Sequence, residues 1–452
     1  TVARSLGDIL TEEVKIPDAS LERAVRQTLN KPKAPLTRSD MGGLVELWAW
    51  VEGIQDLTGL EYASNLMALD LSFNEVKDLS PLAQLTQLQY LALWGNQVED
   101  IAPLAGLEKL WLLDLDENKI KDLSPLKNLA QLRELYFSGN QVEDLSPLAD
   151  LDQLEVVMLA SNKVKDLSAL NHKESLLLLE ASDNRLESLP SFHLPNLLGV
   201  ALVNNGLRDI GPLKDLTSLE ELYLDFNQIR DLSPLAPLTN LRYLTLSYNQ
   251  IDDLTPLTGL SQLVGLSVGN NQIRDLSPLA ALSSLIQLEV YNNGLSDLSP
   301  LSGLKGLMAL DASGNEIRDA APLAQLKDLR VLLLDDNELT SLAPLGSLTN
   351  LYALTLAHNR ISDISPLGEM KGMELLDLHH NQVRDLTPLK GMDNLFILDV
   401  SENRISDLSP LEEKMLAGLY ASQNNIKDLD PVKTIPWLEA ILVAQNEIED
   451  IK

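Results

Sequence analysis

The chain has 452 residues, a formal net charge of −31, 45% hydrophobic but only 4% aromatic residues, and no cysteine. The lack of cysteine excludes disulfides and thiolate metal sites. The negative charge argues against nucleic acid or an anionic membrane surface as partner, because binding to either depends on Lys and Arg. No run of apolar residues approaches the roughly 18 that cross a bilayer, so we expect no membrane insertion.

Residues 1–43 do not follow the repeat that fills the rest of the chain, and we expect them to form a helical N-terminal cap. The segment 19–30 carries its apolar residues on one helical face. They are Leu21, Ala24, Val25 and Leu29. Asp18 or Ser20 is expected to cap the start of this helix, and Pro32 ends it. A second short turn is predicted to begin at 37–40. Such a cap shields the first core layer of a stacked array from water.

From residue 44 to residue 452 the sequence repeats every 21 or 22 residues in the pattern L-x-x-L-x-L-x-x-N. Eighteen repeats end on an asparagine, and one degenerate repeat before them has Glu52 in its place. We call these residues the ladder asparagines. They are Asn74, Asn96, Asn118, Asn140, Asn162, Asn184, Asn205, Asn227, Asn249, Asn271, Asn293, Asn315, Asn337, Asn359, Asn381, Asn403, Asn424 and Asn446. Residues 44–452 are therefore predicted to form one repeat domain.

The pattern within one repeat predicts its local structure. Leu69 and Leu71 alternate with Asp70, as in a short strand with one buried face. A buried Asn74 can bond to backbone groups of its own and the neighbouring repeat. Ser80-Pro81 suits the start of a short 3₁₀ turn. This is the leucine-rich-repeat pattern, and it predicts an α/β solenoid. We expect a right-handed horseshoe or arc with a parallel concave sheet, 3₁₀ or short turns on the convex side, and the helical cap.

An aspartate stands four residues after the ladder position in seventeen of the nineteen repeats, from Asp56 and Asp78 to Asp450. The exceptions are Ser188 and Ser341. We expect these aspartates to cap the amides of the turn that follows, since carboxylates suit unpaired N–H groups. Calcium binding and simple solvation are the alternatives. The acidity of the chain is therefore weak evidence for a basic partner.

Three segments resemble the N-terminal cap of bacterial internalin-type proteins: residues 16–22 (IPDASLE), 36–40 (LTRSD) and 54–63 (IQDLTGLEYA). The 22-residue repeats with D-L-S-P-L are similar to that family as well, so the resemblance covers nearly the whole chain. It implies a secreted or cell-surface bacterial protein that binds other proteins through its concave face. Similar repeats also occur in intracellular bacterial proteins, so a cytoplasmic location stays open. No further domain or anchor motif follows the last repeat, and we expect the core layer around Ile441 and Val443 to be open.

The repeat is irregular in one place. Ala169 replaces the turn proline, the segment 171–175 (NHKES) is unusually polar, and 189–195 (LPSFHLP) replaces the standard turn. A variant repeat with locally changed curvature explains this. The alternative is a convex-side contact at Phe192 and His193.

We find no nucleotide-binding, metalloprotease or serine-hydrolase motif, so the chain is not expected to be an enzyme. One cluster is considered for metal. His358 and His380 hold the same place in adjacent repeats, where equivalent atoms lie about 4.7–4.9 Å apart. With His379, Asp377 and Glu402 they could hold a divalent ion such as zinc. A pH-sensitive contact patch and an ordinary exposed polar surface are the alternatives. No other cofactor is predicted.

Aromatic residues gather at positions predicted to face outward on the concave side. They are Trp48, Trp50, Phe73, Tyr90, Trp94 and Tyr136 in an N-terminal group, and Tyr223, Phe226, Tyr243, Tyr248 and Tyr291 in a central group. A leucine core has no packing need for them, and exposed aromatics interspersed with acids suit a protein interface. We therefore predict a non-catalytic module that binds a protein partner. A carbohydrate or cell-wall ligand, an assembly scaffold, and rings that merely shield neighbouring strands are the alternatives.

Overall fold

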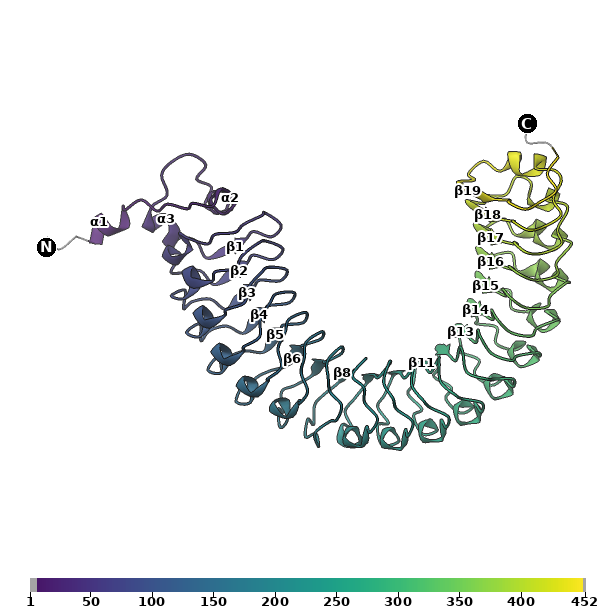
Figure 1. The fold of residues 1–452 in the computed structure, drawn as a ribbon, viewed down its shortest axis with the longest axis horizontal. Coiled ribbons are helices and arrows are strands. Elements are labelled where there is room, and N and C mark those ends of the chain that lie inside the picture. Colours follow the sequence, from purple (N-terminus) through teal and green to yellow (C-terminus); the bar gives the residue numbers. More distant parts are fainter. Residues whose placement is uncertain (1–5, 450–452) are drawn as a thin grey trace. The chain divides into compact units, whose positions relative to one another are not determined.

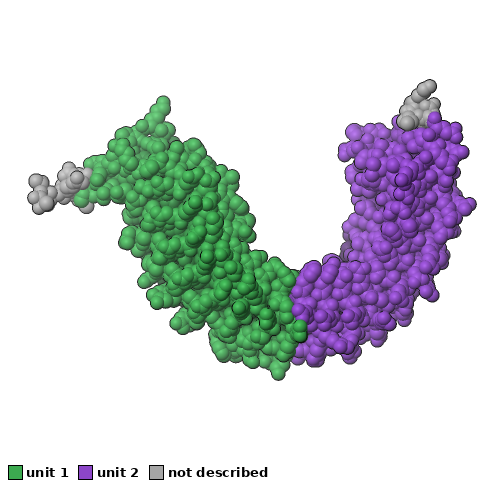
Figure 2. Space-filling view, viewed as in Figure 1, with its two compact units in different colours: residues 1–223 green, residues 224–452 purple. Residues whose placement is uncertain are grey.

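The computed structural model describes residues 6–449 and contains two compact units, residues 1–223 and 224–452 (Figure 2). Each unit is a stack of repeats in which one three-residue strand alternates with a turn. Within each unit the strands lie on the inner side of the curve and the 3₁₀ turns on the outer side (Figure 1). The predicted leucine-rich-repeat solenoid with parallel strands, 3₁₀ turns and a helical N-terminal cap is confirmed.

From residue 6 on, the N-terminal cap contains three helices, α1 (Leu6–Leu10), α2 (Ala19–Thr28) and α3 (Arg38–Gly42). Asp18 caps α2 by accepting hydrogen bonds from the amides of Ser20 and Leu21. Its second carboxylate oxygen accepts from the amides of Gln55 and Asp56, which joins the cap to the first repeat. The predicted helix extended to residue 30 and is two residues too long.

Helix α3 begins where the sequence predicted a second short turn. Thr37 caps α3, and Asp40 returns a hydrogen bond to the Thr37 amide. The buried side chains of the cap, Leu21, Val25 and Met41, cover the end of the repeat core. The short helix α1 was not predicted.

Nine strands of the first unit pair in parallel, each with the strand of the next repeat. They are β1 (Glu46–Trp48), β2 (Ala68–Asp70), β3 (Tyr90–Ala92), β4 (Leu112–Asp114), β5 (Glu134–Tyr136), β6 (Val156–Met158), β7 (Leu178–Glu180), β8 (Gly199–Ala201) and β9 (Glu221–Tyr223). Their 3₁₀ turns are η1 (Leu60–Tyr62), η2 (Ser80–Leu82), η3 (Ala102–Leu104), η4 (Ser124–Leu126), η5 (Ser146–Leu148), η6 (Ser168–Leu170) and η7 (Gly211–Asp215).

The second unit has ten strands paired in the same parallel manner. They are β10 (Tyr243–Thr245), β11 (Gly265–Ser267), β12 (Gln287–Glu289), β13 (Ala309–Asp311), β14 (Val331–Leu333), β15 (Ala353–Thr355), β16 (Leu375–Asp377), β17 (Ile397–Asp399), β18 (Gly418–Tyr420) and β19 (Ala440–Leu442). Its turns are η8 (Ser233–Leu235), η9 (Thr255–Leu257), η10 (Ser277–Leu279), η11 (Ser299–Leu301), η12 (Ala321–Leu323), η13 (Ala343–Leu345), η14 (Ser365–Glu369), η15 (Thr387–Gly391), η16 (Ser409–Leu411) and η17 (Asp430–Thr434).

The repeat length fixes the register of the strands. Leu69 lies opposite Leu91, one 22-residue repeat later. In the shorter repeat that ends at β18, Leu398 lies opposite Leu419, so the missing residue is absorbed outside the strand. Each central strand leucine is buried, as are the leucines of the turn such as Leu82 and Leu85. The core is therefore a continuous aliphatic column within each unit.

The ladder asparagines bond between repeats as predicted. Asn96 donates its side-chain amide to the carbonyl oxygens of Leu71, in the preceding repeat, and Leu93, in its own, at 2.9 and 3.0 Å. Its side-chain oxygen accepts from the Val76 amide at 2.9 Å. One asparagine thus serves backbone groups that the turn out of the strand leaves without partners, in a place closed to water.

The periodic aspartates cap the turns, also as predicted. Asp78 accepts a 2.9 Å hydrogen bond from the Ser80 amide, and this bond lowers the pKa of the Asp78 carboxyl. Every periodic aspartate in the described residues makes the same contact with the amide two residues on. Asp450 lies outside those residues. Much of the acidity of the chain is therefore structural.

The irregular repeat is a variant of the core. Phe192 is buried, because its ring fills space that a turn leucine fills elsewhere. The alternative of a convex-side contact at this side chain is therefore wrong. In the same region Lys173 stands in a core leucine position, fully buried, and its ammonium donates to the carbonyl oxygen of Ala149 at 3.0 Å. Lys414 repeats this arrangement, with bonds to the carbonyls of Lys390 and Met392. Burial lowers the pKa of both ammonium groups.

The last repeat exposes part of its apolar layer, as expected. Ile441, the central residue of β19, is exposed, and Val443 is half-buried. In the part of the chain that the structure describes, no helix has the length and apolar character needed to span a membrane.

Candidate functional site

Each repeat directs several side chains outward from its strand. They stand at the first and third strand residues, at the second residue after the strand, and at the residue before the ladder asparagine. In the repeat of β3 these are Tyr90, Ala92, Trp94 and Gly95. We call the surface that they form the strand face. Because the strands pair in register, equivalent positions form rows across neighbouring repeats.

All eleven predicted aromatic residues lie on the strand face, seven of them exposed and four half-buried. Rings of the N-terminal group contact one another. The centroids of Trp48 and Tyr90 are 5.5 Å apart, and those of Phe73 and Trp94 are 4.5 Å apart, within the range of favourable aromatic pairs. Trp50 is 54% exposed. The structure thus brings four rings of the predicted N-terminal group together as two contacting pairs.

The central group divides between the two units. In the second unit Phe226 and Tyr248 stack with centroids 4.2 Å apart and ring planes at 10°. Tyr243 is exposed, and the half-buried Tyr291 ring covers Gly269, where an added Cβ would come within 2.3 Å of it. Tyr223, the last residue of the first unit, donates its hydroxyl to Glu221. The stacked pair is the part of this group with the most exposed ring surface.

The residue before the ladder position has a left-handed backbone conformation in every repeat, with φ between 49 and 69°. Glycine and asparagine tolerate this region, and other residues pay roughly 1–2 kcal/mol for it. Gly95 and Asn270 are examples of the tolerant type. Phe73, Phe226 and Tyr248 are not of this type, and because their rings are exposed they contribute little to the buried core. Polar residues such as Glu117 and Gln423 adopt the same conformation in other repeats, so the fold does not require a ring at this position.

Exposed apolar side chains also occupy one outward repeat position that was not predicted from the sequence. Trp111, Tyr352 and Phe396 are exposed, and each immediately precedes a strand. Val45 and Met67 occupy the same position in the first repeats and are also exposed. The signal was available as a fifth outward position in the repeat, directly before the first strand residue.

Acidic side chains lie between the aromatic rings of the first unit. Asp114 and Asp116 are half-buried on β4 and just beyond it. Burial, with the neighbouring Asp114 charge as the second cause, raises the pKa of Asp116 to about 6. Burial, and then the hydrogen bond to Glu134 at 2.7 Å, raises the pKa of the Tyr136 hydroxyl. Negative charge is therefore crowded on this part of the strand face.

The histidine cluster does not form the predicted metal site. The rings of His358 and His380 stack with centroids 4.6 Å apart, and Nδ1 of His380 lies 2.6 Å from a Glu402 carboxylate oxygen. Asp377 instead accepts a hydrogen bond from the backbone amide of His379 at 2.8 Å, and burial raises the pKa of its carboxyl. Among residues 6–449, no group of three or more such side chains is arranged to hold a metal ion. The prediction of a divalent ion at these residues is therefore not supported.

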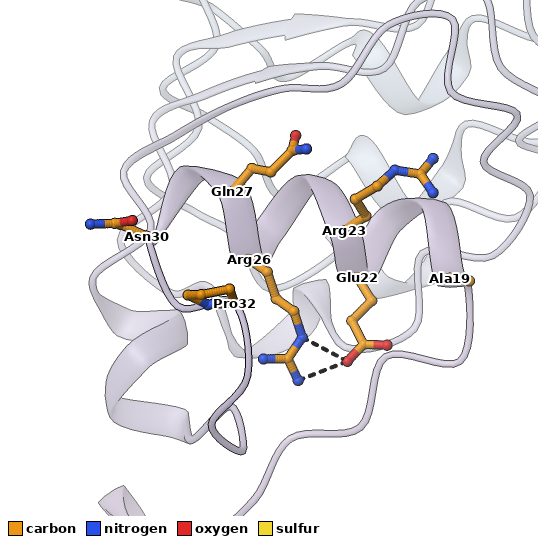
Figure 3. Close-up of a pocket in the computed structure, with 7 residues that line it drawn as sticks. All are labelled: Ala19, Glu22, Arg23, Arg26, Gln27, Asn30 and Pro32. Atoms are coloured by element: carbon orange, nitrogen blue, oxygen red, sulfur yellow. Dashed lines mark hydrogen bonds and ion pairs between the residues drawn. The ribbon is translucent and has the colours of Figure 1, made fainter.

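A depression of about 520 Å³ lies beside α2 in the cap (Figure 3). Its charged side chains are already paired, Arg23 with Glu52 at 3.0 Å and Glu22 with Arg26. Arg26 pairs with Glu22 at 2.8 Å and donates to the carbonyl oxygens of Lys31 and Ala34. Arg26 therefore holds the loop after α2 in place, and the depression is a consequence of cap packing.

Comparison with known proteins agrees with this architecture. A family model described as leucine-rich repeats (2 copies) matches residues 64–109, 86–128, 106–150, 130–172, 200–237, 239–281 and 327–369. A comparison with proteins of curated function found no significant match.

Many solved structures are similar to this chain, among them the following three. An internalin of Listeria monocytogenes is 33% identical, with a TM-score of 0.55, over 80% of this chain and 96% of that one. A leucine-rich-repeat protein of Leptospira interrogans is 25% identical, with a TM-score of 0.68, over 82% of this chain and 93% of that one. The third is the leucine-rich-repeat ectodomain of the receptor kinase GASSHO1/SCHENGEN3 of Arabidopsis thaliana in complex with CASPARIAN STRIP INTEGRITY FACTOR 2. It is 20% identical, with a TM-score of 0.56, over 86% of this chain and 60% of that one, and shows the fold alone.

The repeat model covers more than half of the chain, and the Listeria protein is similar over nearly all of its own length. The chain belongs to the leucine-rich-repeat proteins, and within them it is of the internalin type.

Proposed function

We propose that this chain is a non-catalytic recognition module that binds a protein partner through its strand face. The observation that carries the proposal is the set of exposed aromatic rings held in left-handed backbone positions, Phe73, Phe226 and Tyr248. Such rings lose little rotamer entropy on docking and are typical anchors of protein interfaces. Leucine-rich-repeat proteins generally mediate protein recognition. The proposed location is secreted or at a bacterial cell surface, as the similarity to internalins suggests.

The test is the affinity of an identified partner for three variants of the full chain. Trp94→Ala and Tyr243→Ala each remove an exposed ring from the strand face, one in each unit. Each is expected to weaken binding about tenfold or more with little change in melting temperature. Gln84→Ala changes an exposed residue just after η2 on the turn side and is the matched control.

Candidate partners are obtained by screening the surface proteins of candidate target cells for binding to the full chain, with a glycan array in parallel. Partner affinity that survives both strand-face changes and is lost in Gln84→Ala would show that the chain binds by its turn side. Binding of glycans alone, with loss in Trp94→Ala, would replace the protein partner by a carbohydrate. A mass that rises with concentration in the absence of any ligand would favour a scaffold that assembles with itself.

A further inference from the structure

The strand face of β2 to β5 combines exposed rings with crowded carboxylates, and together these restrict the chemistry of what can dock there. On β3 the small side chain of Ala92 lies between two carboxylates, those of Asp70 on one neighbouring strand and Asp114 on the other. Tyr90 and Trp94 stand two residues to either side of Ala92 on the same face. A side chain that docks over Ala92 would therefore meet aromatic rings along the strand and carboxylates across it.

The charges around this position are close enough to influence one another. Burial, and then the charges of Asp70, Asp114 and Glu134, raise the pKa of the Tyr90 hydroxyl. Burial raises the pKa of Asp114, and the hydrogen bond from the Asp116 amide lowers it by less, so that the pKa is raised overall. The charge of Asp70 raises it further. Three strands of the sheet, β2, β4 and β5, thus direct negative charge toward one region.

No basic side chain of the described residues forms an ion pair with these acids. Arg133, which directly precedes β5, is paired with Glu155 at 2.6 Å. The acids that cap turns, such as Asp122, have a structural role on the other side of the repeat. Asp114 and Asp116 are half-buried instead. They accept hydrogen bonds from the amides of Asp116 and Ser138, but no cation of the described residues balances their neighbouring charges.

We infer that this part of the strand face receives a cationic segment of a protein, in which Arg or Lys alternates with apolar or aromatic residues. The inference rests on the proposed function, since it names the partner chemistry of the same surface. A guanidinium or ammonium group accepts both kinds of neighbour found here. It bonds to carboxylates and is attracted to the faces of Tyr and Trp rings. The apolar residues of the segment would pack on the paired rings of Phe73 and Trp94.

The test uses three synthetic octapeptides, made of four Arg-Phe, four Glu-Phe or four Arg-Ser repeats, titrated calorimetrically into the full chain at neutral pH. The Arg-Phe peptide is expected to bind at least about tenfold more tightly than either of the others, because it alone supplies both charge and apolar surface. Asp116→Asn is expected to weaken its binding several-fold. The substitution keeps an oxygen that can accept the 2.6 Å hydrogen bond from the Ser138 amide, so folding should be preserved.

Asp122→Asn is the matched control, because it removes the same charge from the turn side of the same repeat. It should leave the affinity for the Arg-Phe peptide unchanged apart from a small long-range effect of net charge. Acidification should weaken binding of the Arg-Phe peptide across pH 6, where Asp116 takes up a proton, in the wild type more than in Asp116→Asn.

The outcomes separate this inference from the proposed function. Equal or tighter binding of the Glu-Phe peptide, or no binding of any peptide, overturns the inference and leaves the partner titration to decide the function. If Trp94→Ala weakens binding of the Arg-Phe peptide and Asp116→Asn does not, the strand face still binds the peptide, but the inference of a cationic partner is overturned. Affinity that falls equally in Asp116→Asn and Asp122→Asn reduces the effect to net charge and also overturns the inference.

Discussion

Phe226 and Tyr248 stack face to face one repeat apart, and both stand in left-handed backbone conformation with φ of 56 and 58°. The two facts are connected. In every repeat the chain leaves its strand at the left-handed residue. Equivalent side chains of adjacent repeats therefore lie parallel to one another at the spacing of the sheet. That spacing suits stacked rings, and with Phe226 52% exposed the outer ring surface is available to a ligand.

The first prediction separates the cost of this pair from its use. Tyr248→Asn places a residue tolerant of left-handed backbone where Asn270 stands in the next repeat. Relief of roughly 1–2 kcal/mol of strain offsets the loss of about 0.5–1.5 kcal/mol of stacking, so the free energy of unfolding should change by less than about 1 kcal/mol. Partner affinity should fall about tenfold. Chemical denaturation and a binding titration measure the two effects.

Gln423→Asn is the control for this experiment, because Gln423 has the same backbone conformation and carries no ring. It should raise stability slightly and leave affinity unchanged. A large loss of stability in Tyr248→Asn would mean that the ring pair serves the fold.

The second prediction compares the ladder asparagine of one repeat with the aspartate that caps its turn. Asn162→Ala removes a side chain that donates to the carbonyl oxygens of Phe137 and Leu159 and accepts from the Val142 amide. Leaving those groups unpaired should cost a few kcal/mol, on the order of 3. Asp166→Ala removes the cap on the exposed Ser168 amide and should cost about 0.5–1 kcal/mol. Urea denaturation of both variants settles the order, and a more damaging Asp166 change would reverse our assignment of the ladders.

The third prediction follows from the pKa of Asp116, which rises from 3.8 to about 6 in the folded chain. A raised pKa means that the folded state holds its proton longer than the unfolded state. Asp116 therefore contributes most to stability below pH 3.8, and this contribution is lost as the pH rises through 6. Asp116→Asn should be more stable than the wild type at neutral pH by on the order of 2 kcal/mol. One pKa unit corresponds to about 1.4 kcal/mol, and solvent screening of the half-buried carboxyl reduces the full value.

The pH dependence provides the check on this third prediction. The gain of Asp116→Asn over the wild type should be roughly 1 kcal/mol larger at about pH 8 than at about pH 5. Asp122→Asn should show no such gain, because the hydrogen bond from the Ser124 amide lowers the pKa of Asp122. A gain that is the same at both pH values would contradict the raised pKa.

The fourth prediction concerns the histidine cluster. Because Asp377 is engaged by the His379 amide and Glu402 by His380, zinc should leave the melting temperature of the wild type unchanged. The double variant His358→Ala with His380→Ala should respond to zinc in the same way. Calorimetric scans with and without the ion make the comparison, and a rise that the double variant abolishes would restore the metal site.

The sequence by itself determined the fold and its two polar ladders. Each repeat packs only on its neighbours, so a local pattern such as Leu69, Leu71 and Asn74 contains nearly all the information that one layer needs. The same holds for Asp78, whose partner is only two residues away. The outward positions of Trp48 and Tyr243 could be predicted as well, because the alternation of side chains in a strand is a local property.

The tertiary structure alone decided what depends on neighbours one repeat or more away. It showed that Phe192 and Lys173 fill the core, because burial there depends on the space that adjacent turns leave. It showed that the Asp377 carboxylate accepts a hydrogen bond from the backbone amide of His379. It also showed that Asp114 and Asp116 crowd each other, since the energy of a charge depends on the burial and distance of others that the register brings beside it.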